Sequence, residues 1–299
     1  MFTGFLSIFG NSLLKLVSES LLSLYPVFIK RIQLPIKYQI WVRMAIYSII
    51  SLIFANFSTL LQYFFKPISI LLALVNALHV FVSYIGFKIL DSGVSYSIFY
   101  TYPVLILLFS GQKFNLFYLL PLIGTIILSL QKPQKKSTEK FANIVEEETK
   151  EIKEKNSKKK WWGILAMIAA SITEVAIYFI VKRLDDPNSW NVLLLAYFLP
   201  AIGMSFYLNK NIWKKQYLKH IGFAAVMNGA VGSIGYFLRF FTISRLSTTV
   251  YAVLSYFGVI MAYVYGLIFQ KEKITAWRTV GSCLIIISGI ILYLTNKKN

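Results

Sequence analysis

The chain has 299 residues, of which 57% are hydrophobic and only 14% are charged. A soluble domain is about 45–50% apolar and about 25% charged, so this composition excludes an ordinary soluble protein and predicts an all-α, polytopic integral membrane protein. The formal charge of +19 does not indicate a nucleic-acid partner, because the cations form no stripe interleaved with aromatic side chains. This positive charge is explained by loops that face the anionic headgroups of a lipid bilayer.

Ten apolar stretches have roughly the length of a spanning helix, which needs about 20 mostly apolar residues. They are residues 4–28, 38–56, 67–89, 94–110, 114–130, 161–181, 190–208, 218–241, 247–269 and 274–295. The first stretch has no basic region before it and no obvious cleavage site, so we interpret it as a retained helix and not as a signal peptide.

A charged segment, residues 131–160, divides these stretches into two groups of five. It holds ten lysines and six glutamates. Phe141, Ile144 and Val145 could form one stripe of a short amphipathic helix, and a solvated tether is the alternative. The predicted organisation is therefore a five-helix unit at 1–130, this linker, and a second unit at 161–299.

The two units are related in sequence. Shifting the chain by 152 residues superimposes Lys30 on Lys182, Asn76 on Asn228, Tyr84 on Tyr236 and Ser95 on Ser247. Because each unit has an odd number of predicted spans, the two copies would enter the membrane in opposite senses. Such inverted repeats are typical of transporters that bind their substrate near the membrane midplane.

The second unit resembles the EamA-type repeat of the drug/metabolite transporter superfamily. The similarity lies in "RLSTTVYAVLSYFGVIMAYVYGLIFQKEKITAWRTVGSCLIIISG" (245–289), and "SGVSYSIFYTYPVLILLFSGQ" (92–112) with its mid-helix Pro103 is the counterpart in the first unit. The resemblance implies ten helices in two inverted units around a central cavity. It implies a secondary transporter that moves a small organic metabolite by alternating access. One chain holds both units, so a monomer is sufficient.

Two acidic side chains, Glu19 and Glu174, fall inside predicted spans, where ionisable groups are expensive and are candidates for function. Lys15 lies four residues before Glu19 and is expected to neutralise it. Glu174 has no basic residue within one turn, so its partner must be another helix, a substrate or a proton. Glu174 is the first candidate for proton coupling, ahead of Glu19 and Lys15. The alternative is a structural, protonated glutamate.

Several uncharged polar side chains are candidates for substrate binding, since they bind polar solutes without the expense of a buried charge; they serve equally as contacts between helices. Arg239 is a candidate for an anionic group, although its place near the end of a predicted span favours snorkelling to the interface. Tyr25 suits an interfacial aromatic belt. The candidate binding residues are Asn76, His79, Tyr84, Tyr100, Asn228, Tyr236, Arg239, Tyr251 and Ser255.

No phosphate-binding loop, paired-cysteine motif or zinc-protease motif occurs, so neither cofactor nor metal is expected. An intramembrane enzyme acting on a lipid or isoprenoid, and an adaptor that displays the charged linker, are the alternatives to a transporter. Loops on the linker's side carry 22 Lys and Arg against 8 on the other. This bias places the linker in the cytosol, whereas the resemblance implies cytosolic termini.

Overall fold

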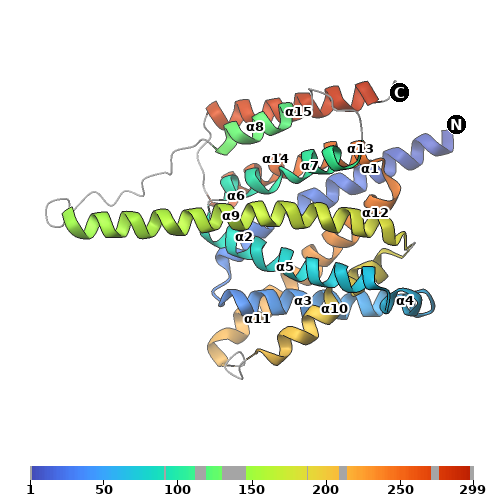
Figure 1. Cartoon of the computed structure of the whole chain (residues 1–299), viewed down its shortest axis with the longest axis horizontal. Coiled ribbons are helices and arrows are strands. Elements are labelled where there is room, and N and C mark those ends of the chain that lie inside the picture. The colour runs from blue at the N-terminus through green and yellow to red at the C-terminus, as the bar shows by residue number, and fades with distance from the viewer. Residues whose placement is uncertain are drawn as a thin grey trace.

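The structure is a computed structural model that describes residues 2–90, 92–111, 119–129, 146–186, 188–208, 214–270 and 276–296. Every regular element in these ranges is a helix, and they contain no strand. The expected all-α class is therefore confirmed. Figure 1 shows most of the helices lying side by side along one common direction.

The first half of the chain contributes eight helices to the described residues. They are α1 (Phe2–Leu22), α2 (Tyr25–Arg31), α3 (Ile36–Phe54), α4 (Phe57–Phe64), α5 (Pro67–Ile89), α6 (Ser92–Phe99), α7 (Tyr102–Phe109) and α8 (Leu119–Ser129). Proline occupies the first turn of α2, α5 and α7. It is tolerated there because the missing N–H would have no partner in the helix.

The second half contains seven α-helices and one π-helical segment in the described residues. They are α9 (Glu146–Leu184), α10 (Ser189–Phe206), α11 (Lys215–Met227), the π-helical η3 (Asn228–Ser233), α12 (Ile234–Arg245), α13 (Thr248–Ser255), α14 (Phe257–Gln270) and α15 (Ala276–Asn296). Asn188 caps α10 and Ser247 caps α13, each accepting a hydrogen bond from a backbone N–H of the first turn.

Among the described residues, seven helical stretches are long and apolar enough to cross a membrane, which confirms a multi-pass membrane protein. They are Ser7–Arg31, Ile36–Phe54, Pro67–Ile89, Lys160–Leu184, Ser189–Phe206, Lys215–Arg245 and Thr248–Phe269. Each overlaps one of the ten predicted spans. The other three predictions, 94–110, 114–130 and 274–295, fall on α6 with α7, on α8 and on α15, which are not among these seven stretches.

The helices of the two halves are interleaved. α5 packs along α9, α1 along α12, α3 along α10, and α8 along α15. In Figure 1 the pair α8 and α15 forms an outer layer, and α3, α10 and α11 lie on the opposite side of the molecule. The central layer therefore contains helices from both halves, with α1, α9 and α12 at its middle.

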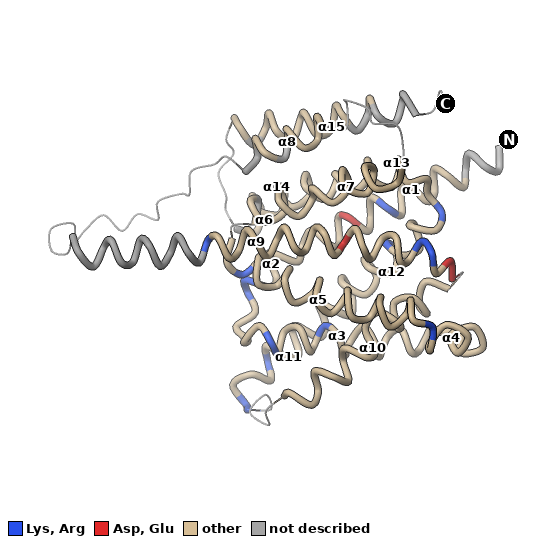
Figure 2. The backbone as a smooth tube through the Cα atoms, in the orientation of Figure 1, with Lys and Arg blue, Asp and Glu red and all other residues tan. Residues whose placement is uncertain are grey.

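The charged residues gather mainly toward the two ends of the bundle, as Figure 2 shows. The first residues of α9 project beyond one of these ends, while α1 begins and α15 finishes at the other (Figure 1). Residues 146–160 of the predicted linker are thus part of α9. Phe141, Ile144 and Val145 lie outside the described residues.

Two stretches that would be single spans are broken halfway. α6 ends at Phe99 and α7 starts at Tyr102, with the bend expected from Pro103 present at this point. α13 ends at Ser255 and α14 starts at Phe257, without a proline. The second break lies inside the candidate span Thr248–Phe269. Within a membrane, backbone irregularity is tolerated only if it is buried in protein or lines a cavity.

Candidate functional site

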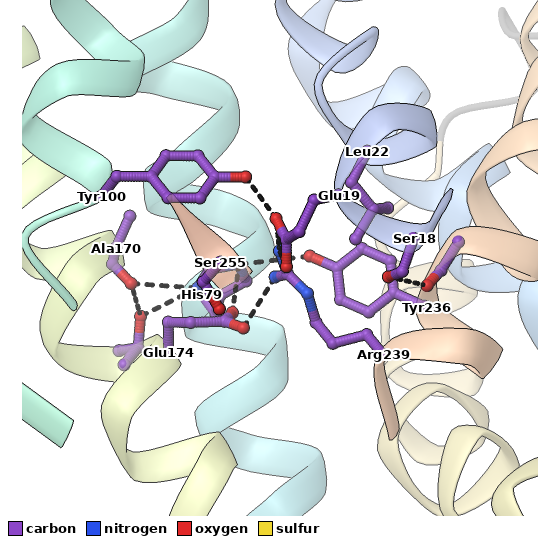
Figure 3. A network of polar contacts seen from close by, with 12 residues as sticks. Ser18, Glu19, Leu22, His79, Tyr100, Ala170, Glu174, Tyr236, Arg239 and Ser255 are labelled. Carbon is purple, nitrogen blue, oxygen red and sulfur yellow. Dashed lines mark hydrogen bonds and ion pairs between the residues drawn. The ribbon is translucent and has the colours of Figure 1, made fainter. Parts of the chain in front are cut away.

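A buried arginine joins the two intramembrane glutamates. The Arg239 guanidinium of α12 donates from Nη1 to Glu174 Oε1 of α9 at 2.7 Å. Its Nη2 lies 3.2 Å and 3.1 Å from the two carboxylate oxygens of Glu19 in α1. All three side chains are at most 1% exposed. Figure 3 shows the Arg239 guanidinium lying between the carboxylates of Glu19 and Glu174.

Glu19 has two further partners. Lys15 forms an ion pair with it one turn earlier in α1, as the spacing predicts, and the Tyr100 hydroxyl donates to Glu19 Oε2 at 2.5 Å. Tyr100 lies in the break between α6 and α7. The ammonium group of Lys15 also sits 3.6 Å from the ring centre of Tyr251 in α13. Both broken helices therefore contribute a tyrosine to the same ion cluster.

His79 of α5 closes the cluster on the Glu174 side. Its Nδ1 lies 3.2 Å from the backbone oxygen of Ala170. The Thr173 hydroxyl lies 3.1 Å from the same Nδ1, so Nδ1 donates to Ala170 in one tautomer and accepts from Thr173 in the other. Nε2 faces Glu174 Oε2 at 3.4 Å and the Tyr236 hydroxyl at 3.5 Å, and a proton on Nε2 or on Oε2 joins the two groups. Oε2 has no other hydrogen-bond partner in the described residues. This contact is a site for one shared proton.

The expectation that Arg239 snorkels to the interface is wrong. The helical stretch that contains it continues from Lys215 to Arg245, so Arg239 lies deeper than a span ending at residue 241 implied. Its side chain is 1% exposed and engages two carboxylates. The gain from pairing with Glu19 and Glu174 inside a low-dielectric core outweighs exposure to headgroups.

A second buried arginine, Arg43 of α3, is not among the residues predicted for the site. Its guanidinium donates to the Tyr197 hydroxyl at 2.8 Å and is surrounded by five tyrosine rings with centres 4.7–5.7 Å away. These rings belong to Tyr25, Tyr47, Tyr84, Tyr197 and Tyr236. The signal was present in the sequence, since Arg43 is the only charged residue between Lys37 and Lys66.

The repeat-related tyrosines meet at Arg43, with ring centres 5.7 Å (Tyr84) and 4.7 Å (Tyr236) from its guanidinium. The repeat-related asparagines, Asn76 and Asn228, do not share a partner as these tyrosines do. Asn76 donates to the Ala196 backbone oxygen of α10 at 3.0 Å, and Asn228 accepts from the Tyr25 hydroxyl at 2.8 Å. Both are contacts between helices.

Three further residues from the sequence analysis, Tyr25, Tyr251 and Ser255, lie in or near the site. Tyr25 is buried, which corrects its assignment to an interfacial belt, because its hydroxyl bonds Tyr47 and Asn228 instead of headgroups. Tyr251 packs on Lys15, and Ser255 donates to the Tyr251 backbone oxygen within α13. Ser255 is thus close to the cluster (Figure 3) but holds its own helix.

A cavity of ≈ 20 Å³ lies between the two arginines, large enough for about one water molecule. Its lining includes both guanidinium-bearing side chains and mostly aromatic or polar neighbours: Leu22, Tyr25, Arg43, His79, Ser83, Phe87, Tyr96, Phe99, Tyr100, Tyr236 and Arg239. A larger hollow of ≈ 650 Å³ lies by Tyr63, Lys66 and Arg183. It contains none of the predicted site residues, so the small cavity is the one that belongs to the site.

Fold and site together define a polytopic membrane protein with a buried ion cluster where its two halves meet. A family model for the EamA-like transporter family matches residues 161–295, which confirms the resemblance of this part of the chain to that family of the drug/metabolite transporter superfamily. A solved structure described as "Crystal structure of protein" is 14% identical, with a TM-score of 0.66, over 96% of this chain and 98% of its own. It shares the fold. No curated protein matches the chain.

Proposed function

We propose that the protein is a secondary transporter that moves a small organic metabolite by alternating access. The observation that carries this proposal is the buried ion cluster of Glu19, Glu174 and Arg239. A fold selected only for stability gains little from buried charges, because their desolvation offsets the attraction between them. Ionisable residues inside the membrane therefore mark a functional site by default.

The packing of helices supports ten spans in two inverted units. Exchanging the first unit (1–130) with the second (161–299) maps α1 onto α9 and α5 onto α12, and the contact of α5 with α9 has its counterpart in that of α1 with α12. α3 packs on its own counterpart α10, as α8 does on α15. The broken helices α6–α7 and α13–α14 are also equivalent. Half-helices that end at the midplane are typical of transporter substrate sites.

Nine side chains are proposed to surround the substrate during the transport cycle. They are Asn76, His79, Tyr84, Tyr100, Asn228, Tyr236, Arg239, Tyr251 and Ser255. Four of them line the ≈ 20 Å³ cavity, and two more, Tyr84 and Asn228, contact the lining residues Arg43 and Tyr25. Opening of the site toward one side of the membrane would then require α1 and α12 to move relative to α5 and α9, because these two helix pairs carry the ion cluster.

The shared proton of His79 and Glu174 provides a coupling device, with Glu19 and Lys15 as its counterpart on α1. Arg239 binds both carboxylates. Protonation of Glu174 removes one of these attractions and leaves Arg239 with Glu19 alone. Loss of this bridge between α9 and α12 would favour separation of the halves. Substrate exchange without proton movement is the second possibility.

Transport is tested with purified protein in liposomes. Vesicles are loaded in turn with unlabelled amino acids, nucleosides and nucleotide sugars, and uptake of the matching labelled compound is measured by counterflow. We expect protein-dependent accumulation of at least one compound class. If every class enters only at the rate of protein-free vesicles, the proposal is contradicted.

The Glu174→Gln substitution tests coupling. Glutamine keeps the shape of the side chain but binds no proton, so uptake of the compound found by counterflow should no longer respond to a pH gradient. Its rate should fall at least about 10-fold, within the range that loss of a positioned acid–base group produces. A pH-sensitive dye inside the vesicles records proton entry.

Asp185→Asn is the matched control. Asp185 is exposed at the end of α9 and has a positive φ of 47°, a conformation that asparagine also tolerates. This variant should transport like the wild type. If Glu174→Gln keeps full, pH-dependent uptake, proton coupling through Glu174 is excluded while transport itself stands.

A further inference from the structure

Arg43 carries a charge that no described carboxylate balances. The side chain is 2% exposed and lies near the middle of the span Ile36–Phe54. None of the ion pairs among the described residues includes it. Its Nε also lacks a hydrogen-bond partner there. A buried cation normally has a counter-charge and its full set of acceptors. Arg43 has neither among the described residues, so its surroundings favour an anionic partner from outside the chain.

Arg43 and Arg239 face the same small cavity. The ring of Tyr236 connects them, with its centre 4.7 Å from the Arg43 guanidinium and 5.4 Å from that of Arg239. Both arginines line the ≈ 20 Å³ cavity. The Nε of Arg239, like that of Arg43, has no partner in the described part of the chain. Two buried N–H donors are thus left unsatisfied beside one hollow.

The charges around this cavity do not cancel. Lys15, Arg43 and Arg239 are cations, and Glu19 and Glu174 are the carboxylates that face them. With His79 neutral and both carboxylates ionised, one positive charge is left over. The tyrosine rings around Arg43 attract it through their quadrupoles but carry no net charge.

We propose that this cavity binds the carboxylate group of an organic monoanion between Arg43 and Arg239. The inference rests on the proposed transport function and names its substrate class. A guanidinium presents a planar fork of donors that matches a carboxylate. One negative charge balances the excess, whereas a dianion would leave a net negative charge. The aromatic walls, including Phe87, Phe99 and Tyr96, suit an apolar body attached to the carboxylate.

The present volume of the cavity makes binding dependent on movement. A hollow of ≈ 20 Å³ holds about one water molecule, so an organic anion enters only when the surrounding rings and helices separate. The cavity is thus closed to such an anion in this arrangement of the helices. Anion binding and opening of the site are two aspects of one step.

Thermal unfolding of the purified full-length protein in detergent tests the proposal. The probes are sodium acetate, pyruvate, benzoate and phenylacetate, each paired with its neutral amide, together with sodium chloride and sodium phosphate. A ligand that binds the folded state raises its unfolding temperature. We expect at least one carboxylate to raise it in a saturable way, and its amide to leave it unchanged.

Arg43→Gln should weaken the binding of that carboxylate about 30-fold or more, because one member of a buried charged pair is removed. Arg43→Lys keeps the charge and should retain part of the affinity. Arg183→Gln, which removes an exposed guanidinium at the end of α9, should bind like the wild type. If Arg43→Gln does not fold, protection of wild-type Arg43 from phenylglyoxal by the carboxylate, followed by mass spectrometry, decides the question.

The proposal is overturned if no carboxylate stabilises the protein, if an amide does so equally, or if Arg43→Gln binds with wild-type affinity. An equal, Arg43-dependent effect of chloride or phosphate would make this a site for an inorganic anion and overturn the organic assignment. Failure of transport is a separate result. Carboxylates that bind through Arg43 without counterflow would leave the anion site and refute the transporter. Counterflow of a neutral or cationic compound, without carboxylate binding through Arg43, would support the transporter and refute the anion site.

Discussion

Replacing Arg239 with glutamine is expected to lower the free energy of unfolding by about 3–5 kcal/mol, as removal of one member of a buried ion pair does. Arg239 is the shared partner of Glu19 and Glu174, with contacts of 2.7–3.2 Å. Its loss leaves Glu174 without a cation and Glu19 with Lys15 alone. The measurement is denaturant unfolding in mixed micelles, followed by circular dichroism.

The double substitution Arg239→Gln with Glu174→Gln should recover part of this loss, because the second change removes the carboxylate that the first left unpaired. Arg245→Gln is the control: it removes a guanidinium from the exposed end of the same helix and should alter stability by no more than about 0.5 kcal/mol. Equal stability of Arg239→Gln and Arg245→Gln would show that the buried ion cluster contributes nothing to the fold.

Gly258→Ala should be nearly as damaging, although it adds only one methyl group. A Cβ built at this position would lie 1.9 Å from the Tyr100 hydroxyl oxygen and 2.9 Å from Glu19 Oε2. The tyrosine ring is rigid and its hydroxyl is held by Glu19, so the ring must move and that hydrogen bond must break. Overpacking typically costs about 1–3 kcal/mol, and a lost hydrogen bond to a charged group adds about 1.5–3 kcal/mol.

Unfolding in mixed micelles measures this effect, and counterflow shows whether function is lost with it. Gly203→Ala is the matched control, since nothing lies within 4 Å of a Cβ added there. Alanine is the better helix former, so this change should be neutral or stabilising by up to about 1 kcal/mol. Wild-type stability of Gly258→Ala would contradict the close approach of α14 to Tyr100 and Glu19.

Much of the fold could be predicted from apolar length alone. Each of the seven long apolar helical stretches overlaps a predicted span, because a bilayer requires about 20 apolar residues whatever the helix packs against. The break before Pro103 was also predictable, since proline supplies no N–H to the preceding turn. The break at Tyr256 was not, because no proline or glycine precedes it and only the packing of α13 and α14 produces it.

The site was predictable in part. Glu19 and Glu174 stood out as charges within apolar runs, and the neutralisation of Glu19 by Lys15 followed from a spacing of four residues. Arg239 was misjudged because its depth depends on where its helix ends. Arg43 was not predicted, although it is the only charged residue between Lys37 and Lys66.

The sequence by itself determined that this is a multi-pass helical membrane protein and that Glu19 and Glu174 stand within apolar runs, because transfer of apolar surface and charge into a bilayer depends on composition and local spacing. Only the tertiary structure decided how those charges pair. The 152-residue register places Glu174 on Leu22 and Glu19 on Ser171, so repeat symmetry gives no reason for the two acids to meet. They meet at Arg239 because α1, α9 and α12 come together there, and electrostatic energy depends on distance in space and not along the chain.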